Sequence, residues 1–321
     1  MMCEAKTDRA CFNLSGGQLL TDSTGQRWIL GKPIGSGTYG EVYSAVMDNP
    51  DSQHGVNTCN EYSIKMSLGS TEVFIYKKIG PIEKIEKWRQ DRKLKFLGMP
   101  KFISTGVNEI GGTKYTFLLD VLEYVHDCGY LHCDIKLTNI VVNPNNRDQV
   151  THFAVYLIDY GTFIFYTYHN GKHRPYEPGP LFANWGTPAY TSRDLHVGAC
   201  SRRGDLEMLA YNLLQWSSGV LPWVTKPEIE ELAIYWEKLR CMDDIPKLFK
   251  QCYGSATPCP GLKEFFDYIV TLKFQEPPNY NLCRQFLKEG LAKAGIVNDG
   301  KLDLMNVADE SVKIEMVLLE I

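Results

Sequence analysis

The pattern of apolar and polar positions changes character near residue 120. Before it, "RWILGKPI", "EVYSAVM" and "EYSIKMS" show the alternation that predicts β-strands, separated by stretches rich in turn-forming residues. "STEVFIYKKIG" and "PIEKIEKWRQDRKLKFLG" predict two helices, the second beginning at Pro81, since proline is favoured in a first helical turn. "KFISTGVNEIGGTKYTFLL" predicts two further strands around a Gly-Gly turn. We therefore expect a mostly β segment with two helices.

From Asp120 onward, helical periodicity dominates. "DVLEYVHDCGY" predicts a short helix ended by Gly129, and "NIVVN" and "FAVYLIDYG" predict strands. Longer helices are predicted by "DLEMLAYNLLQWSSG", "EIEELAIYWEKLRCM" and "GLKEFFDYIVTL". A β-rich segment followed by a helical one is an α+β layout with two lobes. The expected divisions are a flexible leader at 1–18, a small lobe at 19–119, a large lobe at 120–304 and a C-terminal tail at 305–321.

Composition narrows the class of protein. The 321 residues are 44% hydrophobic and 22% charged, as in globular domains, and the net charge of −4 gives no general electrostatic footprint for nucleic acid. No apolar run reaches the ~18 residues of a membrane span, so we expect no membrane partner. The N-terminus lacks the apolar region of a signal peptide, so the 10 cysteines are expected to be reduced thiols. An intracellular monomer, nuclear and/or cytoplasmic, is predicted.

The run "GSGTYG" has the G-x-G-x-x-G spacing and admits three interpretations. It fits a dinucleotide fingerprint, a hairpin whose backbone covers phosphates, or an ordinary glycine turn. A dinucleotide motif continues into a helix, whereas "EVYSAVM" has a strand pattern, which favours the two hairpin interpretations. Lys65 on the next predicted strand is a candidate to neutralise nucleotide phosphates, held by the carboxylate of Glu72. A surface lysine at a strand end is the alternative.

The nine residues "LHCDIKLTN" hold the most concentrated candidate chemistry. Asp134 is predicted to orient or accept the proton of an attacking hydroxyl, and Lys136 to stabilise the transferred phosphoryl group. Asn139 and, in "LIDYG", Asp159 supply the oxygen ligands that Mg²⁺ prefers. With Lys65 upstream, the chain supplies five polar residues whose side chains together suit phosphoryl transfer.

Two other interpretations of this stretch are weaker. Cys128, His132 and Cys133 suggest zinc, but the usual C-x-x-C pairs are missing. Cys133 as a nucleophile needs an electropositive setting, and the neighbouring Asp134 disfavours its thiolate. We expect His132 to have a structural role, bonding to nearby backbone.

Together these motifs resemble those of eukaryotic protein kinases. "DIKLTN", "DYG", "GTPAYTSRDLH", "SRRGDLEMLAYNLLQW" and "GVLPW" are similar to the vaccinia-related kinases of the casein kinase 1 group, and the likeness runs from about Gln18 to about Leu304. It implies a bilobal kinase that uses ATP and Mg²⁺ to phosphorylate Ser or Thr of protein substrates. It also implies that Asp205 braces the catalytic loop and that "GTPAY" helps to position substrate. The nucleotide-binding residues that it implies are Ile34, Gly35, Gly37, Gly40, Val42, Lys65 and Glu72.

One departure from that family lies at Leu119–Asp120. Between the segments that match "KYTFLL" and "DVLEYVH", family members have a hinge, a short helix and the first half of a long helix, and the hinge backbone normally bonds adenine. Here the two segments are joined directly. The resemblance therefore implies complete phosphoryl-transfer residues without the usual adenine clamp. A kinase-like binding or scaffold protein with impaired or absent catalysis is the alternative function.

Overall fold

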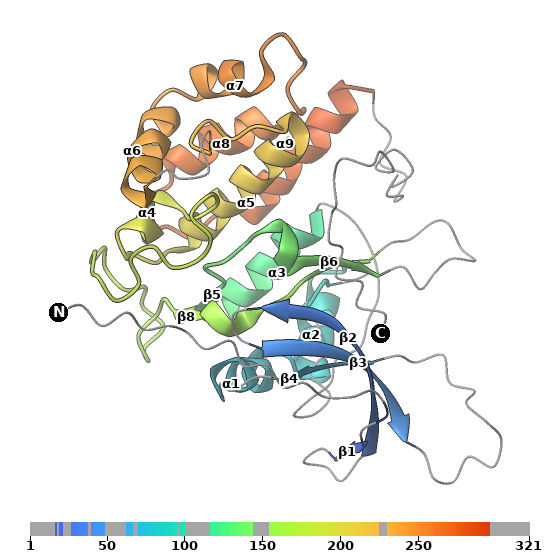
Figure 1. Ribbon diagram of the computed structural model, residues 1–321. Coiled ribbons are helices and arrows are strands. Elements are labelled where there is room, and N and C mark those ends of the chain that lie inside the picture. The colour runs from blue at the N-terminus through green and yellow to red at the C-terminus, as the bar shows by residue number, and fades with distance from the viewer. Residues whose placement is uncertain are drawn as a thin grey trace. The chain divides into compact units, whose positions relative to one another are not determined.

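The computed structural model describes residues 17, 19–21, 27–37, 40–48, 62–66, 70–94, 97–99, 116–143, 154–224 and 230–295. The chain forms two compact units (Figure 1). The first unit comprises residues 1–114, 141–161 and 301–321, and the second comprises residues 115–140 and 162–300. The tail at 305–321 and all of the leader except Gly17 lie outside the described residues, and the assignment of 19–119 and 120–304 as kinase lobes stays a prediction.

The first unit contains an antiparallel sheet with strand order β1-β2-β3-β4. Its strands are β1 (Leu19–Thr21), β2 (Arg27–Gly37), β3 (Gly40–Asp48) and β4 (Tyr62–Met66). Alternate apolar residues meet on one face, as the period of two in a strand requires. They form a buried cluster of Trp28, Leu30, Tyr43, Ala45 and Ile64. The three strands predicted from the sequence for this region are confirmed.

Two helices and a small second sheet complete the described part of the first unit. The two predicted helices appear as α1 (Ser70–Ile79) and α2 (Ile82–Asp91), with Pro81 at the N-cap of α2. Helix α2 ends at Asp91 rather than near Gly98, because Lys93 has a positive φ of 54°, which a right-handed helix does not allow. Ile75, Ile79 and Ile85 are their buried apolar positions. The predicted strand "NIVVN" appears as β6 (Ile140–Asn143), and "FAVYLIDYG" is a strand only over β7 (Ala154–Leu157), because its end turns into a 3₁₀ turn at Tyr160–Thr162. Strands β6 and β7 pair with each other.

Helix α3 (Thr116–Asp127) corrects one sequence prediction. Residues 116–119 were expected to end a strand, but they are helical, and the Leu119–Asp120 peptide lies inside α3. The physical reason is that "FLL" is a run of consecutive apolar residues, which a helix accommodates as well as a strand. Extending an existing helix by a turn is also far easier than nucleating a new element. The rest of the two strands predicted around the Gly-Gly turn lies outside the described residues.

The second unit is predominantly helical. Besides α3 it contains α4 (Arg193–His196), α5 (Arg202–Ser218), α6 (Glu231–Met242), α7 (Ile245–Tyr253), α8 (Leu262–Thr271) and α9 (Tyr280–Lys293). The short strands β5 (Tyr130–Leu131) and β8 (Ile164–Phe165) pair antiparallel. The predictions for α5, α6 and α8 are confirmed, whereas α7 and α9 were not predicted.

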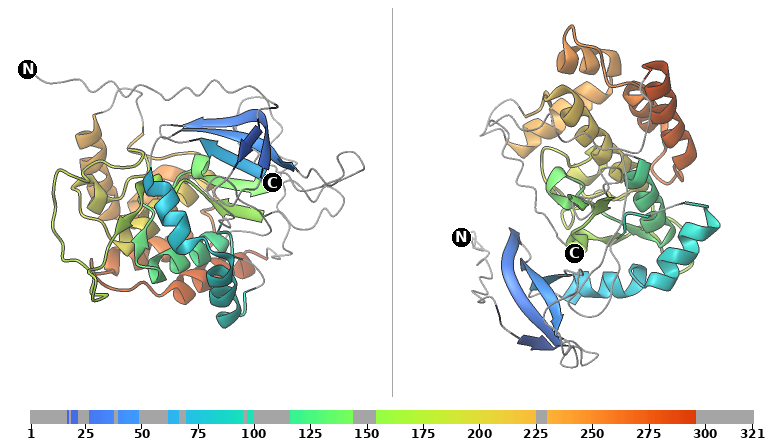
Figure 2. Two further views of the ribbon diagram at one scale, coloured as in Figure 1. Left: turned by 90° about the horizontal axis from the view of Figure 1, so that it is seen from below. Right: turned by 90° about the vertical axis from the view of Figure 1, so that its right-hand side faces the viewer.

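Helix α5 lies among the other helices of the second unit and packs against α4, α7 and α8 (Figure 2). Its buried residues run right round the helix, which is the pattern of a helix enclosed on all sides. The Ser201 hydroxyl caps its N-terminus by accepting from the Gly204 amide, and Gly219 ends it with a positive φ of 73°. In the described part of the chain, no helix is long and apolar enough to cross a membrane.

Candidate active site

The glycine-rich motif lies in a hairpin of the first unit. Gly37 pairs with Gly40 across β2 and β3, Gly35 pairs with Val42, and Val42 pairs with Lys65 across β3 and β4. The hairpin prediction is confirmed, and the dinucleotide interpretation is wrong because no helix follows the last glycine. The register places Gly35, Val42 and Lys65 beside one another across three strands. Ile34 lies in β2 and Glu72 in α1, but the side chains of Lys65 and Glu72, and so their predicted ion pair, lie outside what the structure describes.

The loop that carries Asp134, in the second unit, is held by a buried carboxylate. Asp205, in the first turn of α5, is 1% exposed. Its Oδ2 accepts the backbone N–H of His132 at 2.8 Å, and its Oδ1 accepts that of Cys133 at 3.0 Å. Nε2 of His126, from α3, lies 2.9 Å from the same Oδ2. The prediction that Asp205 braces this loop is confirmed.

The backbone that Asp205 binds has an unusual conformation at Cys133. Cys133 has a φ of +64°, in the left-handed region that residues with a side chain rarely adopt. A hydrogen bond with the Cys200 thiol and burial together raise the pKa of the Cys133 thiol well above its usual value. The thiolate that a nucleophile needs is therefore disfavoured, as expected from the sequence. All seven described cysteines are free thiols, and no described group of three or more His, Cys, Asp or Glu side chains is arranged to hold a metal, which leaves the zinc interpretation without support.

Asp134 is the centre of a cluster of polar side chains and is 7% exposed. Lys136 Nζ lies 2.7 Å from Asp134 Oδ2, and Asn139 Nδ2 donates to the Asp134 carbonyl at 2.8 Å. The structure thus brings together the three residues that the sequence predicted in this loop. The Thr187 hydroxyl donates to Asp134 Oδ1 at 3.0 Å and accepts from Lys136 Nζ at 3.0 Å. Thr187 lies inside the predicted "GTPAY" segment, but its bonds to Asp134 and Lys136 were not predicted.

Gly186 allows that segment to approach the loop. It has a φ of +85°, and a Cβ atom at this position would lie 2.7 Å from the Cys133 carbonyl oxygen. A side chain would therefore push Thr187 away from Asp134.

His132 has the structural role expected of it. It is fully buried, its Nδ1 accepts the Asp134 amide N–H at 3.3 Å, and its carbonyl accepts the Thr162 hydroxyl at 2.8 Å. Its ring meets the ring of Phe163 edge-on at 5.4 Å. These contacts fix the backbone on both sides of Cys133.

Asp159 lies in the first unit, between β7 and the 3₁₀ turn Tyr160–Thr162, with a φ of +64°. The next residue is firmly held, because Tyr160 is fully buried and its hydroxyl donates to the Leu157 carbonyl at 2.6 Å. The Tyr76 ring of α1 meets Tyr160 edge-on at 5.1 Å. Tyr160 thereby anchors the short segment that carries Asp159, a role that the sequence did not reveal.

Asn139 suits a hard cation such as Mg²⁺. Its Nδ2 donates a hydrogen bond to the Asp134 carbonyl, so its amide oxygen is the atom that can coordinate a cation. An amide oxygen and a carboxylate are ordinary Mg²⁺ ligands, so the predicted pair Asn139 and Asp159 has the right chemistry.

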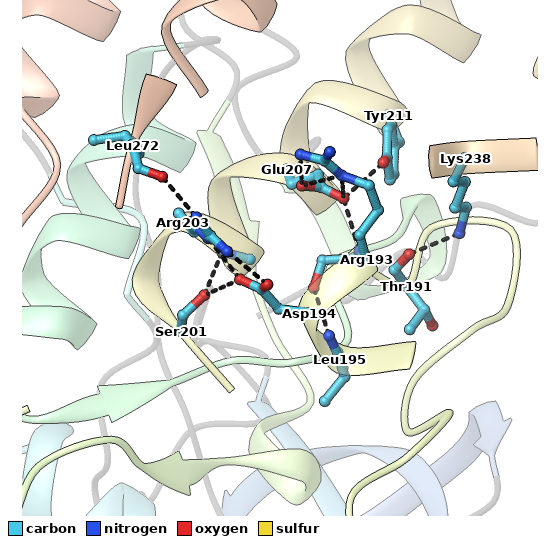
Figure 3. A network of polar contacts seen from close by, with 12 residues as sticks. Thr191, Arg193, Asp194, Leu195, Ser201, Arg203, Glu207, Tyr211, Lys238 and Leu272 are labelled. Carbon is cyan, nitrogen blue, oxygen red and sulfur yellow. Dashed lines mark hydrogen bonds and ion pairs between the residues drawn. The ribbon is translucent and has the colours of Figure 1, made fainter. Parts of the chain in front are cut away.

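Two partly buried ion pairs fix α4, which directly follows the Thr187 segment, against α5 (Figure 3). Arg193 Nη2 lies 3.0 Å from Glu207 Oε2, and Arg203 Nε lies 2.7 Å from Asp194 Oδ2. Burial alone would raise the pKa of Glu207, but the Arg193 guanidinium lowers it below its ordinary value, so the pair stays ionised. Ser201 donates to the Asp194 carboxylate at 2.8 Å.

Comparison with known proteins finds relatives along most of the chain, although no protein-family profile matches it. Human serine/threonine-protein kinase VRK2 is 33% identical over 306 residues, covering 84% of this chain and 58% of the relative. Nucleosomal histone kinase 1 of Drosophila melanogaster is 29% identical over 325 residues, covering 89% of this chain and 52% of the relative. This chain thus spans little more than half of the length of these two relatives.

A viral relative is matched over nearly its whole length. The probable serine/threonine-protein kinase FPV212 of fowlpox virus is 30% identical over 311 residues, covering 85% of this chain and 96% of the relative. The solved structure of vaccinia related kinase 3 superposes with a TM-score of 0.73 at 23% identity, covering 91% of this chain and 95% of that one. The fold is therefore that of a protein kinase, as the sequence predicted. The chain belongs to the vaccinia-related kinase family.

Proposed function

We propose that this chain is a protein serine/threonine kinase, which transfers the γ-phosphoryl group of ATP to Ser or Thr hydroxyls of protein substrates. The observation that carries the proposal is the cluster around Asp134, in which Lys136, Asn139 and Thr187 converge on one carboxylate. Asp205 fixes the backbone that presents it. The names of the human and fowlpox virus relatives, both serine/threonine-protein kinases, support the same activity.

In this proposal Asp134 receives the substrate hydroxyl. Its carboxylate orients the hydroxyl for in-line attack and takes up the proton as the new oxygen–phosphorus bond forms. The bond between the γ-phosphorus and the β,γ-bridging oxygen breaks, and ADP leaves with that oxygen. Lys136, whose Nζ is 2.7 Å from that carboxylate, stabilises the negative charge that develops on the transferred phosphoryl oxygens. Thr187 bonds to both side chains and keeps them at a fixed separation.

We assign the nucleotide to residues of the first unit and the metal to Asn139 and Asp159. Gly35, Gly37 and Gly40 leave the hairpin backbone free to lie close over phosphates, and Ile34 and Val42 offer apolar contact. Lys65, paired with Glu72, neutralises phosphate charge. Mg²⁺ supplies charge neutralisation of the phosphates when it is bound. Substrates are proteins, and we propose a monomer that works in the nucleus or the cytoplasm.

The test is transfer of radiolabelled phosphate from ATP to a panel of basic and acidic proteins. The panel includes a histone mixture, because one relative is named a nucleosomal histone kinase. Wild-type protein is compared with Asp134→Asn and with Asp127→Asn, which changes an exposed carboxylate at the end of α3. We expect transfer by wild type and Asp127→Asn, reduced by about 10³-fold or more in Asp134→Asn. Equal transfer by wild type and Asp134→Asn would refute the proposed activity.

The continuity of α3 through Leu119–Asp120 favours a second candidate, a kinase-like binding module that does not use ATP. The resemblance places Leu119 where the family has the strand before its hinge, and Leu119 is helical here. We therefore propose that the adenine clamp differs from that of the relatives. Thermal unfolding with and without millimolar MgATP separates the candidates. A ligand at 100 times its Kd stabilises the folded state by about 2.7 kcal/mol. A clear rise in Tm supports the kinase, and an unchanged Tm supports the binding module.

A further inference from the structure

Backbone carbonyls of the segment that follows Gly186 are held by side chains from elsewhere in the second unit. Lys238, on α6, is fully buried, and its Nζ lies 2.6 Å from the Pro188 carbonyl and 2.7 Å from the Thr191 carbonyl. The contact with Thr191 is drawn in Figure 3. The indole N–H of Trp223 donates to the Ala189 carbonyl at 2.8 Å. Three carbonyls within four residues are thus bound by two buried side chains.

The hydrogen-bonding capacity of this site matches an ammonium group. The third contact of Lys238 Nζ is His196 Nε2 at 3.2 Å. His196 Nδ1 lies 2.9 Å from the Asn184 amide oxygen, so the ring carries its proton on Nδ1 and offers the Nε2 lone pair to Lys238. Three N–H donors therefore face three acceptors. A neutral amine has only two donors and would leave one acceptor unbonded.

Lys238 is bound through these carbonyls rather than through a carboxylate. Within the described residues no ion pair of Lys238 is found. The charge of Glu207 acts on it, but that carboxylate is bonded by Arg193 and by the Tyr211 hydroxyl. The rings of Tyr211 and Trp223 lie 5.2 and 5.6 Å from Nζ and attract the cation weakly. Burying a cation in this way is unfavourable, and an apolar side chain would fill the space without that penalty.

The bound segment carries Thr187, the residue next to Pro188. Thr187 bonds to both Asp134 and Lys136, so displacement of the 187–191 backbone moves a partner of the catalytic carboxylate. We propose that the Lys238 ammonium is a positioning residue, which fixes the 187–191 backbone as the floor on which a protein substrate docks and keeps Thr187 against Asp134. This rests on the proposed kinase function, and it assigns the protein-substrate side of that function to a residue that touches neither ATP nor the reacting atoms.

Lys238 changes its charge within a pH range at which the protein can be studied. Burial lowers the pKa of Lys238 to about 7. The groups that face it titrate elsewhere: burial and the Lys238 charge lower the pKa of His196 to about 3, and burial raises that of Tyr211 well above its usual value. The pKa of Glu207 is lowered and that of Arg193 is raised through their mutual ion pair, against the effect of burial. Near pH 7, Lys238 alone among these groups changes its charge.

The experiment compares Lys238→Met, which keeps the length of the side chain without its charge, with Lys250→Met, the same change at an exposed position of α7. Hydrogen exchange of peptides that cover residues 186–192 reports the position of the segment, and steady-state kinetics are measured separately for ATP and for a protein substrate. In Lys238→Met we expect exchange to rise about tenfold and kcat/KM for the protein substrate to fall about tenfold or more, with KM for ATP within about twofold of wild type. Lys250→Met should match wild type in every readout.

Unchanged exchange at 186–192 in a folded Lys238→Met overturns the proposal, and so does an equal loss toward ATP and toward the protein substrate. If Lys238→Met does not fold, wild-type protein decides the matter. A local opening that breaks the two carbonyl contacts while Lys238 stays buried disfavours the ammonium further, unlike global unfolding, which returns Lys238 to water. Exchange at 186–192, corrected for the intrinsic pH dependence, should therefore rise as the pH is raised through about 7, and a flat profile would overturn the proposal. If wild type shows no transfer that depends on Asp134, the kinase function fails, and the exchange data alone still test the role of Lys238.

Discussion

Replacing Asp205 with asparagine is the sharpest test of how the loop that carries Asp134 is held. The carboxylate accepts the backbone amides of His132 and Cys133 and faces His126 Nε2. An asparagine has one acceptor oxygen and one NH₂ group in place of two acceptor oxygens. In either orientation of the amide, the NH₂ group faces a backbone N–H, so one buried donor of the loop loses its partner.

The magnitude follows from these contacts. An orphaned buried N–H costs about 1–3 kcal/mol, and each remaining bond loses roughly 1 kcal/mol when its acceptor is no longer charged. Relief of the desolvation of the Asp205 carboxylate, which is 1% exposed, offsets part of this loss. We expect a net loss of about 3 kcal/mol in the free energy of unfolding. For a unit of this size that corresponds to a fall in Tm of roughly 6–12 °C.

The assay is thermal and urea unfolding of Asp205→Asn beside Asp267→Asn. Asp267 makes a surface ion pair with Lys263 and its side chain is 46% exposed, so the control should change the free energy of unfolding by less than about 0.5 kcal/mol. Transfer by the folded fraction of Asp205→Asn should also fall, because the Asp134 backbone directly follows the amides of His132 and Cys133, one of which is released. Equal unfolding midpoints for Asp205→Asn and the control would refute the reasoning.

Three further changes give expected outcomes. Gly186→Ala should lower the free energy of unfolding by about 2 kcal/mol in urea titrations, since φ is +85° and the new Cβ would meet the Cys133 carbonyl at 2.7 Å. Arg284→Met should destabilise the protein by about 3 kcal/mol at neutral pH, because Asp120, 2.6 Å from Arg284, would be left buried without its partner. Burial already raises the pKa of Asp120 above 3.8, so the folded variant binds the extra proton and its loss of Tm should shrink as the pH falls from 7 toward 4.5. Burial lowers the pKa of Lys238 from 10.5 to about 7, so the unfolded state binds more protons than the folded state between these two pH values. Lys238 should therefore make the Tm of the wild type rise with pH across that range, and Lys238→Met should remove this rise.

The sequence predicted those elements whose pattern is set locally. Helices α5, α6 and α8 have long periodic patterns, and the hairpin of Gly37 and Gly40 is specified by glycines between two alternating strands. The strand expected at residues 116–119 was wrong because its apolar residues are consecutive, and direct attachment to a strong helix decided their conformation. The local pattern of apolar residues cannot decide between a strand and the extension of a neighbouring helix.

In the candidate site, too, the residues that are close in sequence were predicted and the contacts between distant residues were not. Asp134, Lys136 and Asn139 were predictable because they share one loop, and their mutual contacts follow from their spacing. Thr187 meets Asp134 across 53 residues of sequence, so only the folded backbone shows the contact. Lys238 gave no signal at all: a lysine in a helical pattern is expected at the surface, and its acceptors come from residues 42 to 50 positions earlier in the chain.

Helix α3 connects the Leu119–Asp120 junction with the residues that hold the loop of Asp134. Its N-terminal half contains the Leu119–Asp120 junction, where Arg284 of α9 binds Asp120. Its C-terminal half carries His126, which meets Asp205. Asp120 and His126 are six positions apart, which is roughly 9 Å of helix at 1.5 Å per residue. Buried residues and the Arg284 ion pair fix the helix along this length, so the Leu119–Asp120 peptide and the contact of His126 with Asp205 belong to one firmly held helix. The placement of Asp134 therefore depends on Asp205, Thr187 and the segment bound by Lys238.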